Sequence, residues 1–227
     1  ALDPVLEALS SLTCPNLRMV SICTQSASAN AISNLLCQLH LGPDPDQWLL
    51  LSMMGTDECL AVAEAIRLGL CNVQRLHLSF NPKHGATATR VGVALANALT
   101  HNSTLRFFTF GGLALRFPVY EAFSAMLRIN TSVVVKVNSS VNGDDQRLVD
   151  SRNQMVIEQQ LNNVGRGRLL SSSQTPRNEW VDALNDLNSD SCVNEIPKFH
   201  VSCLFSLLRL NPSVCLLELS DTTTPRL

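Results

Sequence analysis

A short strand motif recurs along roughly the first 140 residues, and this repeat restricts the fold more than any other feature of the chain. The motif holds an apolar residue, two variable residues, a second apolar residue, one variable residue and a third apolar residue. Its copies start at residues 17, 48, 73, 105 and 133, and are therefore 31, 25, 32 and 28 residues apart. The last copy is degenerate, because Lys136 stands where an apolar residue is expected. A period of this length corresponds to one strand followed by one helix.

Helical patterns occupy the segments between these strands. Thr56 is placed to cap the second helix and Pro118 to open the fourth. A single strand and helix cannot bury their apolar faces alone, whereas stacked copies bury a continuous core. Each helix then serves as the crossover that two parallel strands require, so the sequence predicts an α/β fold with a parallel sheet. Apolar residues recur at three- and four-residue spacing in four segments: residues 31–39, 60–70, 91–99 and 122–127.

Two phrases of the repeat carry a family resemblance. Residues 73–81 end the strand motif on Asn81, and the helical residues 94–99 are followed by Asn102-Ser103-Thr104-Leu105. Residues 125–133 repeat this helix–Asn–strand phrase. These segments resemble leucine-rich repeats of the ribonuclease-inhibitor-like subclass, and the resemblance covers about residues 10 to 140.

The resemblance implies a leucine-rich-repeat solenoid, a horseshoe with a parallel sheet on its concave side and helices outside. The family includes enzyme inhibitors, GTPase activators and actin-end cappers, so the resemblance is specific for fold and not for function. Only one strand carries the expected ladder asparagine, at Asn81. Gln25, Thr56 and Leu113 stand at the equivalent places, which predicts irregular turns.

The repeat ends after Asn138, and a helical C-terminal cap and extension are expected beyond it. A long helix is predicted from about residue 145 to 162, and the Asn163-Val164-Gly165-Arg166 ending looks similar to segments that close such arrays. A serine-rich linker at 171–174 then leads to two further helices, whose core would be thin alone. The predicted division is a solenoid over 1–140, a capping helix over 141–170, and a small extension packed on the solenoid over 171–227.

Composition limits the classes of partner and the compartment. The net charge of −2 gives no basic excess to neutralise phosphates, so nucleic acid is not expected as a partner. No run approaches eighteen apolar residues, so no membrane span is expected. The eight cysteines form no CxxC pair, and buried reduced thiols are favoured over a disulfide framework. The chain is therefore expected in an intracellular, reducing compartment, the cytoplasm or an organelle.

No set of residues points to catalysis. The five histidines are scattered, no zinc-helix motif occurs, and no Ser or Cys lies in a nucleophile-elbow sequence. We therefore expect that the chain is not an enzyme and that it has no catalytic residue, metal or cofactor. Asp44 and Asp46 flank a proline and are expected to be solvated. The glycosylation sequences at Asn102 and Asn130 coincide with the repeat phrase, which favours a structural role for both.

The variable strand positions are the candidate binding surface, because in this fold they face the concave side. Several are large and apolar, and exposed apolar clusters mark interaction sites. Arginines also recur at equivalent positions of three strands, where they are expected to form a basic strip. The alternative is that the C-terminal extension or an upstream segment covers this face. The predicted partner-binding residues are Arg18, Met19, Leu50, Arg75, His77, Arg106, Phe107 and Val135.

Three functions stay open at this point. The first is a non-catalytic scaffold that binds another protein on the concave sheet. The second is a constitutive accessory subunit of a larger, multi-subunit complex. The third is a regulator of an enzyme such as a GTPase, which rests on the family resemblance alone and for which the insertion at residues 83–85 is the only candidate loop.

Overall fold

The chain divides into two units, Ala1–Gln159 and Gln160–Leu227. The computed structural model describes residues 2–10, 13–14, 18–25, 27–41, 47–81, 87–111, 115–138 and 146–163. The predicted extension over 171–227, the Gly165-containing ending of the cap and the insertion at 83–85 lie outside the described residues.

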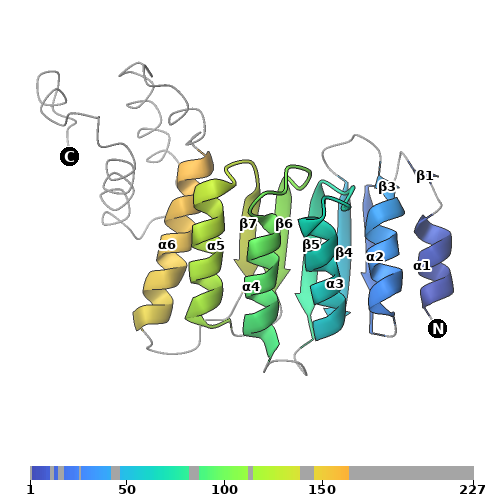
Figure 1. Ribbon diagram of the computed structural model, residues 1–227, viewed down its shortest axis with the longest axis horizontal. Coiled ribbons are helices and arrows are strands. Elements are labelled where there is room, and N and C mark those ends of the chain that lie inside the picture. Colours follow the sequence, from blue (N-terminus) through green and yellow to red (C-terminus); the bar gives the residue numbers. More distant parts are fainter. Residues whose placement is uncertain are drawn as a thin grey trace, which may run out of the picture. The chain divides into compact units, whose positions relative to one another are not determined.

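Five parallel strands form one sheet, and they lie in the order in which they occur in the sequence. Each successive pair is joined by a segment that contains one of the helices, as the repeat predicts (Figure 1). A separate two-stranded sheet pairs β1 (Thr13–Cys14) with β3 (His40–Leu41). The five strands of the main sheet are β2 (Met19–Cys23), β4 (Trp48–Met54), β5 (Arg75–Phe80), β6 (Phe107–Gly111) and β7 (Val134–Asn138).

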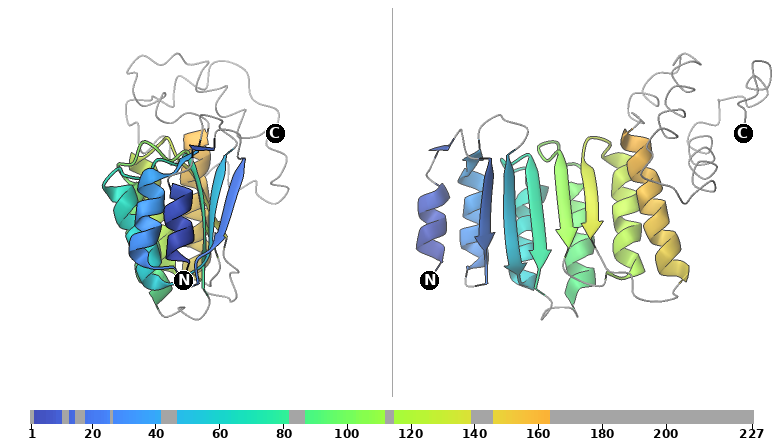
Figure 2. Two further views of the ribbon diagram at one scale, coloured as in Figure 1. Left: turned by 90° about the vertical axis from the view of Figure 1, so that its right-hand side faces the viewer. Right: turned by 180° about the vertical axis from the view of Figure 1, so that it is seen from behind.

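The helices cover one face of this sheet and leave its other face without a described helix (Figure 2). Neighbouring helices from α1 to α5 pack against one another in chain order. The α/β class with a parallel sheet and outer helices is confirmed. The described helices are α1 (Asp3–Ser10), α2 (Ala29–Gln38), α3 (Thr56–Arg67), α4 (Ala88–Leu99), α5 (Phe117–Ile129) and α6 (Gln146–Asn163).

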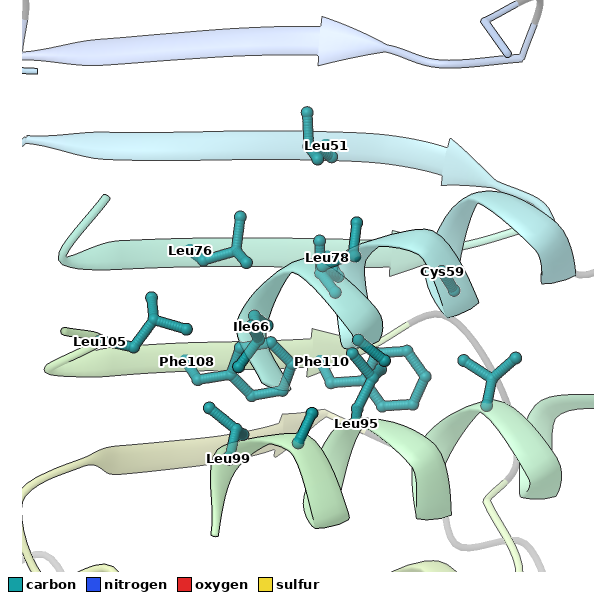
Figure 3. Packing of buried hydrophobic residues seen from close by; sticks show 14 of the residues in the cluster. Leu51, Cys59, Ile66, Leu76, Leu78, Leu95, Leu99, Leu105, Phe108 and Phe110 are labelled. Atoms are coloured by element: carbon teal, nitrogen blue, oxygen red, sulfur yellow. The ribbon is translucent and has the colours of Figure 1, made fainter. Parts of the chain in front are cut away.

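The core lies between the sheet and the helices, and the two periodicities of the sequence build it. Along β5, buried Leu76, Leu78 and Phe80 alternate with half-buried residues, because successive strand side chains point to opposite faces. Figure 3 shows Phe108 and Phe110 of β6 lying against Leu95 and Leu99 of α4. The ring of Phe108 also stacks on that of Phe123, with centroids 6.2 Å apart. These residues belong to one continuous cluster that spans the repeats.

Two glycines lie where a larger side chain would clash or would strain the backbone. Gly92 lies where α4 approaches α5, and a Cβ there would come within 2.6 Å of a methyl carbon of Val119. Gly69 follows α3 with a φ of +70°, which ends the helix in the left-handed conformation. The Leu70 N–H then donates to the Ala65 carbonyl at 2.9 Å and caps the helix end.

Asparagines at the start of the strand phrase tie each repeat to the one before it. The Asn102 side chain donates to the Ile66 carbonyl at 3.2 Å and accepts from the Leu105 N–H at 2.9 Å. The Asn130 side chain donates to the carbonyls of Leu99 and Asn102 at 2.6 and 2.7 Å. Both asparagines are buried, so their amides serve as internal hydrogen-bonding groups, as the structural interpretation of these positions predicts. A buried, bonded amide is no acceptor for a glycan at either position.

Helix α6 lies at the β7 end of the sheet, where it was predicted to lie over the last repeat. The Gln159 side chain accepts a hydrogen bond from the Val135 N–H of β7 at 2.7 Å. Arg128 of α5 donates to buried Glu158 of α6 at 2.8 Å, so the helix is also fixed to its neighbour by an ion pair.

Candidate partner-binding face

The candidate site is the sheet face opposite the helices, which we call the open face. It carries the strand side chains that alternate with the core residues, and their type changes along the strands. Most are large near the amino ends of the strands, whereas Ser52 and Ser79 follow nearer the carboxyl ends, and Ser21 pairs with Leu50. The large members and their nearest neighbours are Met19, Trp48, Leu50, Arg75, His77, Phe107, Val134 and Lys136.

Strand register brings these residues into two rows across the sheet. Met19 pairs with Trp48, Arg75 with Phe107, and Phe107 with Val134. Trp48 and Arg75 directly precede the paired Leu49 and Leu76, so all five share the first row. In the second row, Leu50 pairs with His77, His77 with Thr109, and Thr109 with Lys136.

Arg75 packs against two aromatic rings at the centre of the first row, and those rings, of Trp48 and Phe107, have centroids 6.2 Å apart. The carbon of its guanidinium is 4.0 Å from the centroid of the Phe107 ring and 5.3 Å from that of the Trp48 ring. Both rings attract the cation through their electron-rich faces, and each contact contributes about 0.5–1 kcal/mol at a partly exposed site. The stack therefore holds a long, flexible side chain in a defined place across three strands.

The open face is basic among the described residues. Arg18 and Arg106 precede β2 and β6, Lys136 lies within β7, and all three are exposed. Every described acidic residue belongs instead to a helix. His77 lies half-buried in the second row, and burial lowers the pKa of its imidazole below the usual value.

The structure places five of the eight predicted residues on this face, and two more, Arg18 and Arg106, directly before the amino ends of β2 and β6. Arg18, Met19 and Arg106 are exposed, and Met19 keeps 57% of its surface exposed despite being apolar. Leu50, Arg75, His77 and Phe107 are half-buried in the two rows.

The prediction for Val135 is wrong, because this residue lies in the core with 3% of its surface exposed. Two residues lie between buried Leu105 and buried Phe108, whereas only one lies between Val133 and Val135, which pairs with Phe108. A one-residue difference moves every following side chain to the other face of a sheet. Val134 and Lys136 therefore occupy the open face in β7.

The register predicted for the second strand is also wrong. Leu49 was expected on the binding face but is fully buried, and Trp48 was expected in the core but lies on the open face. The run Trp48-Leu49-Leu50-Leu51 is apolar throughout, so hydrophobic alternation gives no signal in it. Trp48 stands at the position that Arg75 and Phe107 occupy in the next strands. Its large aromatic side chain was the available sign of the correct register.

Comparison with known proteins gives no assignment. No protein-family model, curated protein or solved structure matches this chain. Function is therefore argued from the geometry of the face itself. None of the helices that the structure describes has the length and apolar character needed to cross a bilayer.

A second surface feature lies where the chain leaves the carboxyl ends of β2, β4 and β5. It is a polar hollow of about 540 Å³, lined in part by Asp57, Glu58 and Asn81. The hydroxyl oxygens of Thr56 and Thr87 lie 2.5 Å apart at its wall. Within the described ranges, no three His, Cys, Asp or Glu side chains converge as metal ligands would. Asp44 and Asp46 lie outside those ranges.

The cysteines of the described part differ in exposure. Cys59 and Cys71 are buried, as predicted, but Cys23 at the end of β2 is exposed, so the prediction of buried thiols is wrong there. Burial raises the pKa of the Cys59 thiol to about 12 and that of Cys71 to about 11. Only the thiolate is nucleophilic. Both thiols therefore react slowly with electrophiles, because reagents do not reach them and because little of either is ionised.

This difference predicts the order of alkylation. At about pH 8, iodoacetamide should modify exposed Cys23 well before Cys59 or Cys71, because those two thiols are buried and their raised pKa values leave little thiolate. Peptide mass spectrometry after brief labelling measures the three rates. In urea the rates should converge, and equal rates in the native chain would contradict the burial of Cys59 and Cys71.

Proposed function

We propose that the first unit is a leucine-rich-repeat solenoid whose open, concave sheet binds another protein without catalysis. The support for the solenoid is the chain-order parallel sheet, the one helix between successive strands of that sheet, and the buried asparagines that link the repeats. Stacked units of this kind present extended surfaces suited to binding.

The observation that carries the proposal is the stack that Arg75 forms with the neighbouring rings of Trp48 and Phe107. Trp and Arg are the residue types that dominate binding energy at protein interfaces, and such residues cluster near the interface centre. Here they occupy the middle of the first row, with exposed Met19 at one end and Val134 at the other. Because the stack already orders the arginine, less side-chain entropy remains to be lost on binding.

The size of the face indicates what kind of contact it makes. Five strands about 4.8 Å apart and about five residues long give a face of roughly 24 Å by 17 Å, or about 400 Å². A standard interface between folded proteins buries about 800 Å² on each partner. The sheet alone therefore fits a segment of a partner better than a whole folded surface.

A second candidate is the constitutive subunit, and one observation favours it. Leu68 and Ile129, at the ends of α3 and α5, are apolar and keep 52% and 61% of their surfaces exposed away from the open face. Apolar residues at helix ends are suited to permanent contacts within an assembly. No described residue supports the regulator of a GTPase.

Affinity purification of the full chain from its source tests the two candidates with matched variants. Trp48→Ala/Phe107→Ala removes the stack from the open face, and Leu68→Ala/Ile129→Ala removes equally apolar side chains elsewhere. We expect a protein that copurifies with the wild type to be lost from the first variant and retained by the second. Thermal melts of both variants establish that they remain folded.

The opposite pattern would overturn the proposal. A copurifying protein that is retained without the stack but lost from Leu68→Ala/Ile129→Ala would assign the contact to the helix ends and favour the constitutive subunit.

A further inference from the structure

We infer that the segment bound by the open face is acidic: an extended stretch of another protein whose Asp or Glu side chains meet the cations of the face and whose apolar side chains cover Trp48, Leu50 and Phe107. This inference rests on the proposed function and specifies the chemistry of its partner.

Charge complementarity is the first argument. The whole chain carries a net charge of −2, yet the described open face and its rim carry Arg18, Arg75, Arg106 and Lys136 and no acidic residue. The described acids are all on helices, as noted above. The charge of the described face is therefore positive, whereas the net charge of the chain is negative. A negatively charged segment is attracted to this face rather than to the helices.

The stacked arginine supplies the second argument. The guanidinium of Arg75 packs against two rings whose centroids are only 6.2 Å apart, so both rings lie on one side of the cation and its N–H groups stay available elsewhere. A carboxylate matches two of these N–H groups at once, and such paired bonds are among the strongest in proteins. The rings of Trp48 and Phe107 limit the positions that the guanidinium of Arg75 can take, so less freedom is lost when a carboxylate binds it.

The remaining side chains favour a protein segment over a nucleic acid. Met19, Leu50 and Val134 are aliphatic and have no role in contacting phosphates. Only three described exposed cations border the face, and nucleic-acid affinity depends on the number of phosphates neutralised. An extended protein segment rises about 3.3 Å per residue, so about seven residues cross the five strands with alternate side chains directed to the sheet.

A display library of random segments of about twelve residues tests the inference on the full chain. Three forms are screened: the wild type, Trp48→Ala/Phe107→Ala, and the charge-reversed Arg18→Glu/Arg106→Glu/Lys136→Glu. The wild type should select segments rich in Asp and Glu with interspersed Leu or Phe. The charge-reversed form should select basic segments and bind the acidic ones at least about tenfold more weakly.

Arg90→Glu/Arg152→Glu is the matched control, because both arginines are exposed on helices away from the face. It should select the same acidic segments as the wild type. A neutral or basic wild-type pool that is still lost from Trp48→Ala/Phe107→Ala would overturn the inference while the proposed function stands. A pool that does not depend on Trp48 and Phe107 would overturn both.

A single-stranded deoxythymidine oligonucleotide of about the same net charge as the selected segments separates the two kinds of polyanion. The selected segments should bind more tightly than the oligonucleotide. Tighter binding of the oligonucleotide, lost from Trp48→Ala/Phe107→Ala, would overturn the inference in favour of a nucleic-acid face.

Discussion

Replacing Asn130 with alanine should lower the free energy of unfolding by about 2–4 kcal/mol, since two buried carbonyls, of Leu99 and Asn102, lose their donor. The same change removes the acceptor for the Ser132 N–H and hydroxyl. A void left in the buried site adds to the cost. Urea denaturation followed by circular dichroism measures the difference from the wild type.

Asn72→Ala is the matched control within the same ladder of asparagines. Its side chain also donates to a carbonyl of the preceding repeat, that of Cys37, but Asn72 is exposed. Water replaces the lost donor there, so we expect a cost of only about 0.5–1 kcal/mol. Equal losses of unfolding free energy at the two positions would mean that burial does not determine how much these amides stabilise the fold.

Replacing Phe108 with alanine should have the largest effect of all, about 3–5 kcal/mol of unfolding free energy. Its ring is fully buried between the sheet and the helices and stacks on Phe123. The surrounding core is closely packed, so the neighbouring side chains collapse only in part into the space. The same denaturation experiment measures the change.

Phe107→Ala provides the comparison, because the two phenylalanines are adjacent but point to opposite faces. Phe107 is half-buried and contacts Arg75, so its loss should cost about 1 kcal/mol in stability and act mainly on binding. A larger cost at Phe107 than at Phe108 would show that the register of β6 is off by one residue, and the open face would have to be redrawn.

The order of strands and helices could be predicted from the sequence because their two periodicities differ. Helical spacing located the helices from α2 to α5, and the long helix expected over 145–162 is α6, Gln146–Asn163. Alternation of polar and apolar residues located β5, and the spacing of the strand motif located β6. The solenoid itself, the compartment and the absence of catalysis stay predictions.

Register was harder to predict than the existence of a strand. In the second strand the apolar run from Trp48 to Leu51 removes the alternation, and in the last a missing residue shifts Val135 into the core. Both cases depend on which residue of one strand pairs with which residue of the next. Pairing is a property of the assembled sheet, set by turns and by neighbours far away in the chain.

The central feature of the candidate site was beyond sequence reasoning for a related reason. Arg75 was predicted as one member of a basic strip, not as a cation that packs against the rings of Trp48 and Phe107. Those three residues come from three strands, and Trp48 had been assigned to the core. A contact across strands follows from the register, so an error in one strand hides it.

The hydrogen bond from the Val135 N–H to the Gln159 side chain affects the tendency of this chain to aggregate at high concentration. β7 is an edge strand of the described sheet. The unpaired N–H groups of an edge strand can bind a strand of another chain, and such pairing leads to aggregation. Gln159 occupies one of these donors from within the same chain, and α6 lies alongside. A single amide side chain and the helix that carries it therefore oppose edge-to-edge growth into fibrils at this end of the described sheet.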